Sequence, residues 1–495
     1  MSESISRKAL RGALYGFIGW VFPITLSFFA TRILVLRMGT EEYGIYSLIV
    51  GFISYLFVFN LSRAVTKHVA ASSQESSEVI STTFFLSLMF ASLITILILL
   101  LSSRLTLEVL RVDVRWQVEV IKGLQIAAIS VFFLMIGQTF IAIIHGLQRF
   151  DIYSKITSAF NLLLIIGNVL IVLYGHGFLA LLIWNLFIVI FNTMVFYAIS
   201  RKLLPDLQFF KLPRKAAIFE VFRYAGSNLG YQILANLFFL LERSWIIRNF
   251  GSSDLSYYAL PMMVGIQMHF FITSFIQFVF PLASELNSDP KRLEQLYTKG
   301  IKYVFIMTLF LAIFLILQRK AFLHLWLGGE FVEKSGNLLV IHVITYSLIA
   351  LIGIIWSIFD GIGLPHISFI SYSISFVIAV ILMFLLGIYG IDWVGIIRLI
   401  STVVLLAFAI YFERTYINKR LLGFWMKLLT KGLIIILFFV ALNAILESFN
   451  LSPGISLSVF LFTSLPMYFL LLLLLRLITF EEVAVFKLLS KLRAC

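Results

Sequence analysis

The stretch RILVLRMGTEEYGIYSLIVG (Arg32–Gly51) decides the fold, because a related stretch occurs a second time in the chain. RSWIIRNFGSSDLSYYALPMMVG (Arg243–Gly265) has a similar pair of arginines, a following glycine and a similar aromatic-rich continuation. The second stretch begins 211 residues after the first. In the first copy Gly39 is expected to end one helix, and Glu41 and Glu42 are expected to favour the start of the next through its dipole.

A second, looser pair supports the repeat. AIIHGLQRF and SIFDGIGLP place Gly146 and Gly361 at nearly the same separation along the chain as Arg32 and Arg243. Two matches at nearly one offset predict an internal duplication. The basic stretch RKLLPDLQFFKLPRK (Arg201–Lys215) lies between the two copies.

The composition is that of a membrane protein. Hydrophobic residues make up 61% of the 495 residues and charged residues only 13%, whereas soluble proteins carry about 25% charged residues. Long apolar runs without strict alternation indicate helices rather than a barrel. In a soluble domain a net charge of +14 would suggest nucleic-acid binding, but here the positive-inside rule explains it. The single cysteine, Cys495, excludes an intramolecular disulfide.

We expect an all-α polytopic protein with about fourteen spans of about 20 apolar residues each. The first follows Arg7, Lys8 and Arg11 and is too long for a signal peptide, so we interpret it as a retained span. The expected spans are 12–36, 44–67, 79–101, 121–144, 155–174, 177–200, 217–242, 255–280, 300–318, 337–359, 365–387, 391–412, 430–447 and 455–478.

Charge distribution orients the spans. With the N-terminus in the cytoplasm, 26 of the 38 Lys and Arg residues fall on the cytoplasmic side and 12 on the other. This bias predicts that both termini are cytoplasmic. A shift of six spans keeps orientation, so the halves are expected to be parallel repeats about an axis along the membrane normal. The expected organisation is a six-helix bundle at 1–200, a basic cytoplasmic linker at 201–216, a second six-helix bundle at 217–412, and two extra spans with a basic tail at 413–495.

Three short motifs resemble a known family. They are GTEEYGIY (Gly39–Tyr46) after the first span, FNLSRAVTKHVA (Phe59–Ala70) at the end of the second, and GLQRFDIYSK (Gly146–Lys155) between the fourth and fifth. With the chain length and the two halves, they resemble the polysaccharide-transporter branch of the multidrug/oligosaccharidyl-lipid/polysaccharide exporter superfamily.

The resemblance implies a MATE-like fold with two bundles around a central cavity and alternating access. It implies a flippase of the bacterial inner membrane. The substrate would be an undecaprenyl-diphosphate-linked glycan, such as an O-antigen, capsule or exopolysaccharide repeat unit in lipopolysaccharide or other polysaccharide biosynthesis. Partners among the biosynthetic proteins are expected, and no cofactor is.

Moving such a lipid requires cationic and hydrogen-bonding groups inside the membrane, where a charge costs roughly 2.5–3.5 kcal/mol. Asn60, Arg63 and Lys67 occur at i, i+3 and i+7, which suits an anionic head group, but a cytoplasmic helix end explains them equally. The same topological explanation is favoured for Arg149.

Arg32 and Arg243 are related by the repeat and lie toward the outer side, against the charge bias. They are candidates for the cavity wall. Two polar stripes at helical spacing are further candidates, with interhelical hydrogen bonding as the alternative. The stripes are Asn228, Gln232 and Asn236 in the seventh span and His269, Thr273 and Gln277 in the eighth.

Asp360 and Asp392 could bind a coupling H⁺ or Na⁺, although helix-end positions explain them too. The membrane potential alone could also drive export of an anion.

Other classes fit less well. A multidrug or cation antiporter of the same fold would need acidic residues inside the spans, and the first span has none. A membrane polymerase or ligase would need a large outer loop with catalytic groups, and the loops between the expected spans are too short for that. A channel or scaffold would not need repeat-related arginines. No phosphate-binding loop, nucleophile elbow or metal-ligand spacing occurs.

Overall fold

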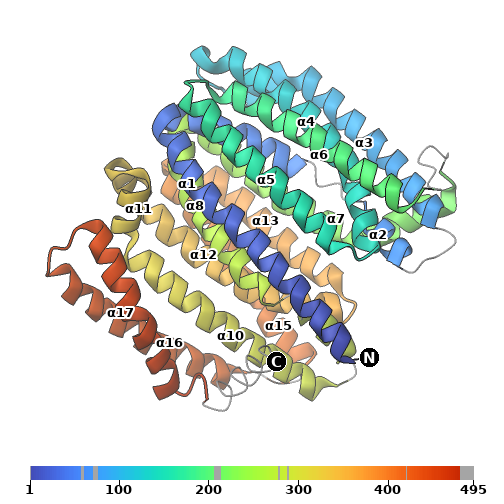
Figure 1. Ribbon diagram of the computed structural model, residues 1–495. Helices are drawn as coiled ribbons and strands as arrows, with labels where there is room; N and C mark the ends of the chain where they lie inside the picture. Colours follow the sequence, from blue (N-terminus) through green and yellow to red (C-terminus); the bar gives the residue numbers. More distant parts are fainter. Residues whose placement is uncertain are drawn as a thin grey trace. The chain divides into compact units, whose positions relative to one another are not determined.

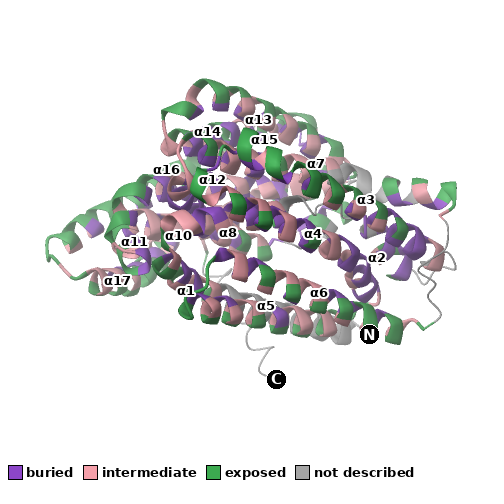
Figure 2. Cartoon of the chain, turned by 90° about the horizontal axis from the view of Figure 1, so that it is seen from above, coloured by how far each residue is buried: buried purple, intermediate pink, exposed green. Residues whose placement is uncertain are grey.

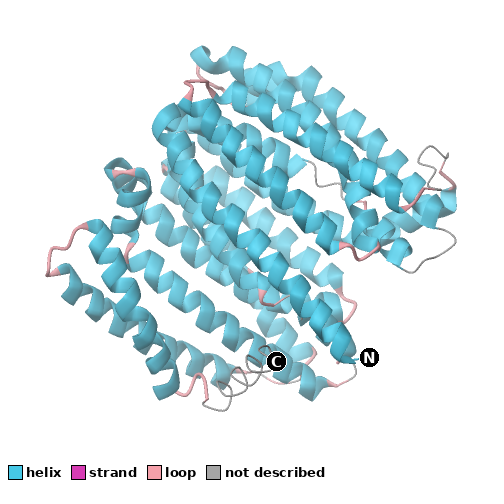
Figure 3. Cartoon of the chain, viewed as in Figure 1, coloured by secondary structure: helices cyan, strands magenta, loops and turns pink. Residues whose placement is uncertain are grey.

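The long apolar runs form helices, since only intrahelical hydrogen bonds can satisfy the backbone of a segment surrounded by lipid. The computed structural model describes residues 2–56, 61–70, 76–205, 213–276, 279–286, 289–417, 419 and 421–479. Over these ranges it contains helices and loops and no strand (Figure 3). The chain divides into two compact units, which we call the N-terminal unit (Met1–Ala259 with Tyr372–Val394) and the C-terminal unit (Leu260–Ser371 with Gly395–Cys495).

In the N-terminal unit, α3 packs on α4, α4 on α6, and α5 on α1 (Figure 1). Its helices α8, α13 and α14 belong to it only in part. The helices of the unit are α1 (Ser2–Leu56), α2 (Arg63–Ala70), α3 (Ser76–Arg104), α4 (Gln117–Gly146), α5 (Phe150–Leu173), α6 (Phe178–Leu203), α7 (Lys215–Asn249), α8 (Ser252–Ser274), α13 (Pro365–Leu386) and α14 (Ile391–Val404), with short helical turns at Leu105–Val109, Val114–Trp116 and Gly387–Tyr389.

In the C-terminal unit, α12 packs against α9, α10 and α11, and α16 packs against α10 and α17. The remaining parts of α8, α13 and α14 complete it. Its own helices are α9 (Val279–Glu285), α10 (Pro290–Leu317), α11 (Arg319–Leu327), α12 (Gly329–Gly361), α15 (Ala407–Thr415), α16 (Leu422–Glu447) and α17 (Pro453–Leu474).

Burial separates central from peripheral helices. The most apolar windows of α4, α8 and α12 are more than half buried, whereas that of α5 is 17% buried (Figure 2). Large apolar side chains such as Phe462 on α17 are exposed. An apolar exterior of this kind is what a membrane protein presents to lipid.

Eleven helices among the described residues are long and apolar enough to cross a membrane. They correspond to the expected spans from 79–101 to 177–200 and from 255–280 to 455–478. The chain is therefore an all-helical polytopic membrane protein, with about eleven candidate spans rather than the fourteen expected. The other three expected spans, 12–36, 44–67 and 217–242, fall largely in α1 and α7, which do not meet the same criterion over their described residues.

Both repeated glycines adopt the backbone conformation that the sequence requires of them. Gly39 interrupts α1 with φ 81°, and Gly251 separates α7 from α8 with φ 101°. Such positive φ values suit glycine because it has no Cβ.

The second motif pair shows the same agreement. We call the separation between Gly146 and Gly361 the repeat offset. Gln148 and Gly363 are related by the repeat offset, and both have positive φ at the end of a helix. Gly175 and Gly390, which also have positive φ, form a further pair at this offset. The backbone turns therefore recur in register along the two halves of the chain.

Two expected spans are shorter than predicted. The sequence predicts one helix over 44–67, but residues 61–62 form a turn directly before α2 begins at Arg63. The span 255–280 ends at Ser274, and α9 begins at Val279.

The two repeated turns lie against each other within the N-terminal unit. The Thr40 hydroxyl donates to the Ser253 hydroxyl at 3.3 Å, and the Ser256 hydroxyl donates to the Thr40 carbonyl oxygen. Gly44 makes this approach possible, since a Cβ there would collide with the carbonyl oxygen of Ser252. Close backbone packing at a glycine is a frequent feature of membrane helices.

Gly44→Ala should therefore destabilise the protein by about 1–3 kcal/mol, because backbone atoms must move to accept the methyl group. Gly423→Ala on α16 is the matched control, since a Cβ there meets nothing within 4 Å. Thermal unfolding in detergent measures both. Equal melting temperatures for the two variants would show that the Gly44 contact is not tight in the protein.

Candidate functional site

The glutamates of the repeated turn hold helices in place. The Glu42 carboxylate accepts the backbone N–H of Phe178 at 2.7 Å, at the first residue of α6. Glu41 accepts the indole N–H of Trp116 at 3.1 Å and pairs with Arg115. A carboxylate at a helix N-terminus is favoured by the helix dipole. Glu42 is the carboxylate at the N-terminus of α6. The sequence instead predicts that Glu42 stabilises the start of its own helix.

Arg243, one of the two repeat-related arginines, is half-buried on α7. Its guanidinium donates to the carbonyl oxygen of Ser47 at 2.9 Å and to the Ser47 hydroxyl at 2.6 Å. Arg32, its counterpart on α1, is exposed. Arg243 therefore ties α7 to the second part of α1, and Arg32 presents its charge at the surface of the N-terminal unit.

The polar stripe on α7 is described in part. Gln232 and Asn236 are both partly exposed, in a segment where the neighbouring Phe238 is buried. The side chain of Asn228 lies outside the described residues. Their assignment to a cavity wall stays a prediction.

The two described residues of the polar stripe on α8 have different neighbours. His269 lies beside Tyr346 of α12, with ring centroids 6.2 Å apart. The Thr273 hydroxyl donates to the carbonyl oxygen of Phe270, so it has a hydrogen-bond partner on its own helix. Gln277 lies outside the described residues.

A buried cationic cluster in the C-terminal unit is absent from the sequence-based candidates. Arg398 on α14 is 2% exposed, donates to the Tyr346 hydroxyl at 3.2 Å, and lies 5.9 Å from the centre of that ring. His342, one turn before Tyr346 on α12, is fully buried. The count of Lys and Arg on the two sides of the membrane treats Arg398 as a loop residue. Its position inside the expected span 391–412 instead indicates that it lies within the membrane.

The candidates that the charge bias assigns to the cytoplasmic side lie at helix ends. Arg149 and Asp151 are exposed and form two hydrogen bonds, of 3.0 and 3.2 Å. Lys67 on α2 is exposed. Asn60 and the side chain of Arg63 lie outside the described residues, so the predicted common face of Asn60, Arg63 and Lys67 is untested.

The two aspartates proposed for ion coupling also lie near helix ends. Asp360, in the last turn of α12, accepts from the Ser368 hydroxyl at 3.3 Å. Asp392 lies in the first turn of α14. Over the described residues, no group of three or more His, Cys, Asp or Glu side chains could hold a metal ion.

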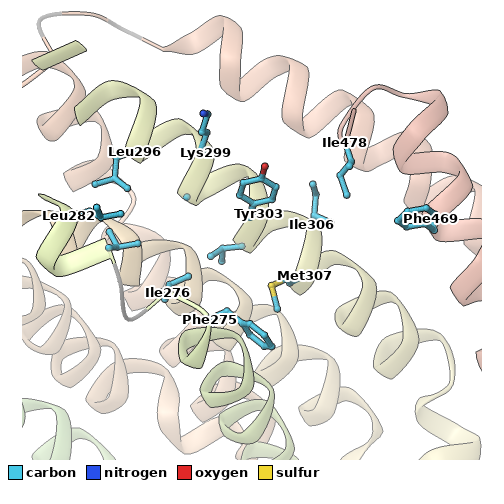
Figure 4. Close-up of a pocket in the computed structure, with 13 residues that line it drawn as sticks. Phe275, Ile276, Leu282, Leu296, Lys299, Tyr303, Ile306, Met307, Phe469 and Ile478 are labelled. Carbon is cyan, nitrogen blue, oxygen red and sulfur yellow. The ribbon is translucent and has the colours of Figure 1, made fainter. Parts of the chain in front are cut away.

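An apolar pocket of about 760 Å³ lies in the C-terminal unit, lined by the two residues that follow α8 and by residues of α9, α10 and α17 and the segment after α17. Phe275, Met307 and Phe469 line its interior (Figure 4). Lys299 and Tyr303 on α10 direct their polar atoms to one side of it, as Figure 4 shows. A pocket of this size and lining suits a hydrocarbon chain with a polar group at its rim.

Comparison with known proteins identifies the family and the fold. The model of the family "Polysaccharide biosynthesis protein" matches residues 32–335. A "Putative O-antigen transporter" of Shigella flexneri is 21% identical over 389 residues, which are 77% of this chain and 92% of the relative.

Two solved structures show the same architecture. The lipid II flippase MurJ in an inward closed conformation aligns with a TM-score of 0.72 at 14% identity, over 92% of this chain and 97% of that one. A MATE family multidrug resistance transporter of the MOP superfamily, facing inward, aligns with a TM-score of 0.68 at 18% identity, over 80% and 94%. The family match covers more than half of the chain, and these alignments show that its fold is that of the two solved structures. The protein belongs to the polysaccharide biosynthesis protein family and is a multi-pass membrane protein with a MurJ- and MATE-like fold.

Proposed function

We propose that the protein is a flippase that moves an undecaprenyl-diphosphate-linked oligosaccharide from the cytoplasmic to the periplasmic leaflet of a bacterial inner membrane. The similarity to an O-antigen transporter supports the glycan class. The bias of Lys and Arg supports cytoplasmic termini. The two halves would alternate access as parallel repeats around a polar cavity.

Arg398 is the observation that carries the proposal. An arginine 2% exposed in a membrane helix is expensive to keep, so it usually serves a substrate or ion pathway. A guanidinium recognises phosphate oxygens with paired, charge-assisted hydrogen bonds. A lipid diphosphate is an anion of that kind, and Tyr346 and His342 supply neighbouring hydrogen-bonding groups. Arg32, Arg243, Gln232, Asn236 and His269 stay candidates for substrate binding.

The apolar pocket on α10 supports a lipid-linked rather than a free glycan. It offers hydrocarbon lining to a prenyl chain, and Lys299 at its rim offers a positive charge to a phosphate. The membrane potential favours outward movement of an anion by about 2.3 kcal/mol per charge per 100 mV, so ATP is not required.

A multidrug or cation antiporter is the second candidate. The similarity to a MATE transporter favours it, as does Glu242, a fully buried carboxylate on α7. In a flippase, Glu242 would instead suit coupling to inward H⁺ or Na⁺. Efflux of a cationic dye from intact cells separates the two functions, and we expect the deletion strain to retain normal efflux.

Deletion of the gene, in a strain without a paralogue, should leave lipid-linked glycan in the cytoplasmic leaflet, and the wild-type gene should restore export. Arg398→Met should restore less than about a tenth of it, since the phosphate loses a charged partner. Methionine fills much of the volume of the arginine and brings no charge that needs a partner in the interior, so the melting temperature of the variant should hold.

Arg398→Lys keeps the charge and should restore export in part. Export by Arg398→Met at the wild-type level would remove the arginine from the mechanism. Loss of export together with a collapsed melting temperature would mark Arg398 as structural. Export of glycan by the deletion strain itself would refute the flippase function.

Met307→Trp should fill the apolar pocket and slow export several-fold, because the prenyl chain would lose its contact surface. Leu433→Trp is the control, since Leu433 is 55% exposed on α16 and does not line the pocket. Export is measured in the complemented deletion strain. Equal export by the two variants would exclude a role for the pocket.

A further inference from the structure

A second cavity, the N-terminal slot, lies wholly within the N-terminal unit. It has a volume of about 310 Å³ and is lined by residues of α1, α4, α5 and α6. Its polar lining consists of uncharged amides and hydroxyls, among them Gln138, Thr157, Asn161, Asn185, Asn192 and Thr193.

The slot runs along its helices. Its lining extends from Tyr153 to Leu164 on α5 and from Asn185 to Phe196 on α6. Eleven residues of helix rise about 16 Å, which is about half the hydrocarbon thickness of a membrane. The Tyr153 and Phe196 rings stack at one end, and the Trp184 indole donates to the Leu164 carbonyl oxygen at the other.

The amides suit a polyhydroxylated ligand. Each amide side chain both donates and accepts hydrogen bonds, as a sugar hydroxyl does. The Asn185 side-chain oxygen is buried and has no hydrogen-bond partner among the described residues. An unsatisfied buried polar group costs about 1–3 kcal/mol, so a ligand that satisfies it would gain that energy.

The slot does not suit a single cation. Asn185 and Asn192 lie seven residues apart on α6, which separates their backbones by about 10 Å. The oxygen ligands of a hard cation lie about 2.0–2.6 Å from the ion, so these two amides could not share one. A saccharide ring is long enough to meet several of the amides in turn.

The second half of the chain indicates that the amides are not needed to pack the helices. Two pairs of turns share the repeat offset: the turn at Gln148 with that at Gly363, and the turn at Gly175 with that at Gly390. At that offset, the counterparts of Gln138, Asn161, Asn185 and Asn192 are Gly353, Phe376, Ile400 and Ala407. These four residues lie in or beside α12, α13, α14 and α15, so helices form there without any of the amides.

We propose that the N-terminal slot binds one uncharged sugar unit of the lipid-linked glycan while the diphosphate is held elsewhere. The inference depends on the proposed flippase function and adds a sugar-recognition site to it. The absence of charge in the lining makes neutral sugars the class that it selects, and the volume, at the lower end for ligand pockets, limits it to a small part of the glycan.

The test compares two ligands on the full-length protein in nanodiscs. One is undecaprenyl diphosphate, and the other is the undecaprenyl-linked repeat unit extracted from the host. The wild type should bind the glycan-bearing lipid about tenfold more tightly, a preference that one or two hydrogen bonds can supply. Asn185→Leu combined with Asn192→Leu should abolish that preference and leave the affinity for undecaprenyl diphosphate unchanged.

Asn168→Leu is the matched control. Asn168 is a buried amide on α5 that is outside the slot lining and lies 3.5 Å from the Tyr46 hydroxyl. This variant should keep the preference for the glycan-bearing lipid. The slot assignment is wrong if the double variant keeps the preference for the glycan-bearing lipid. It is also wrong if the double variant loses only a stabilisation of the protein by Na⁺. If the wild type binds neither lipid, the flippase function fails and the slot proposal falls with it.

Discussion

The free-energy cost of a polar group in hydrocarbon governs where the side chains of this protein lie. Backbone groups are satisfied within helices, and side-chain groups must find partners inside the protein or serve a ligand. The Thr40, Ser253 and Ser256 hydroxyls satisfy one another and a backbone carbonyl at the repeated turns. Glu42 satisfies the first N–H of α6. Against this background, the amide-lined slot and the buried Arg398 are the features that a stable fold alone does not require.

Duplication offers a way to separate function from stability. Each half repeats the same turns, so a polar residue in one half can be compared with its counterpart at the repeat offset in the other. At the repeat offset, the slot amides correspond to apolar or small residues in the second half, and Arg398 corresponds to Ile183 in the first half. The proposed division therefore assigns neutral recognition of sugar to one half and cationic recognition of phosphate to the other.

The sequence predicted the helices well because apolar length is a property of each span alone. It also predicted that Gly39 ends a helix, and the positive φ of Gly39 agrees with that prediction. It did not predict the breaks before α2 and α9, nor α11, which occupies part of an expected loop at 319–336. α11 buries Leu323, Trp326 and Leu327, and such packing depends on neighbours that are distant in sequence.

The candidate site was less predictable, because helical spacing does not tell which face meets a cavity. The stripe through Thr273 had the expected spacing, yet its hydroxyl bonds to its own helix. Arg398 was not predicted as a site residue, because a count of Lys and Arg by membrane side does not distinguish an arginine within a span from one in a loop. The slot amides lie on three helices, so no local pattern joins them.

Reconstitution of the purified protein in vesicles tests the central claim most directly. The vesicles would contain undecaprenyl-diphosphate-linked repeat unit in both leaflets, and a glycan-cleaving enzyme outside would digest the outer pool. If the protein is a flippase, digestion should pass the halfway point and approach completion, faster than in protein-free vesicles. Digestion that stops at about half, with or without protein, would contradict the account.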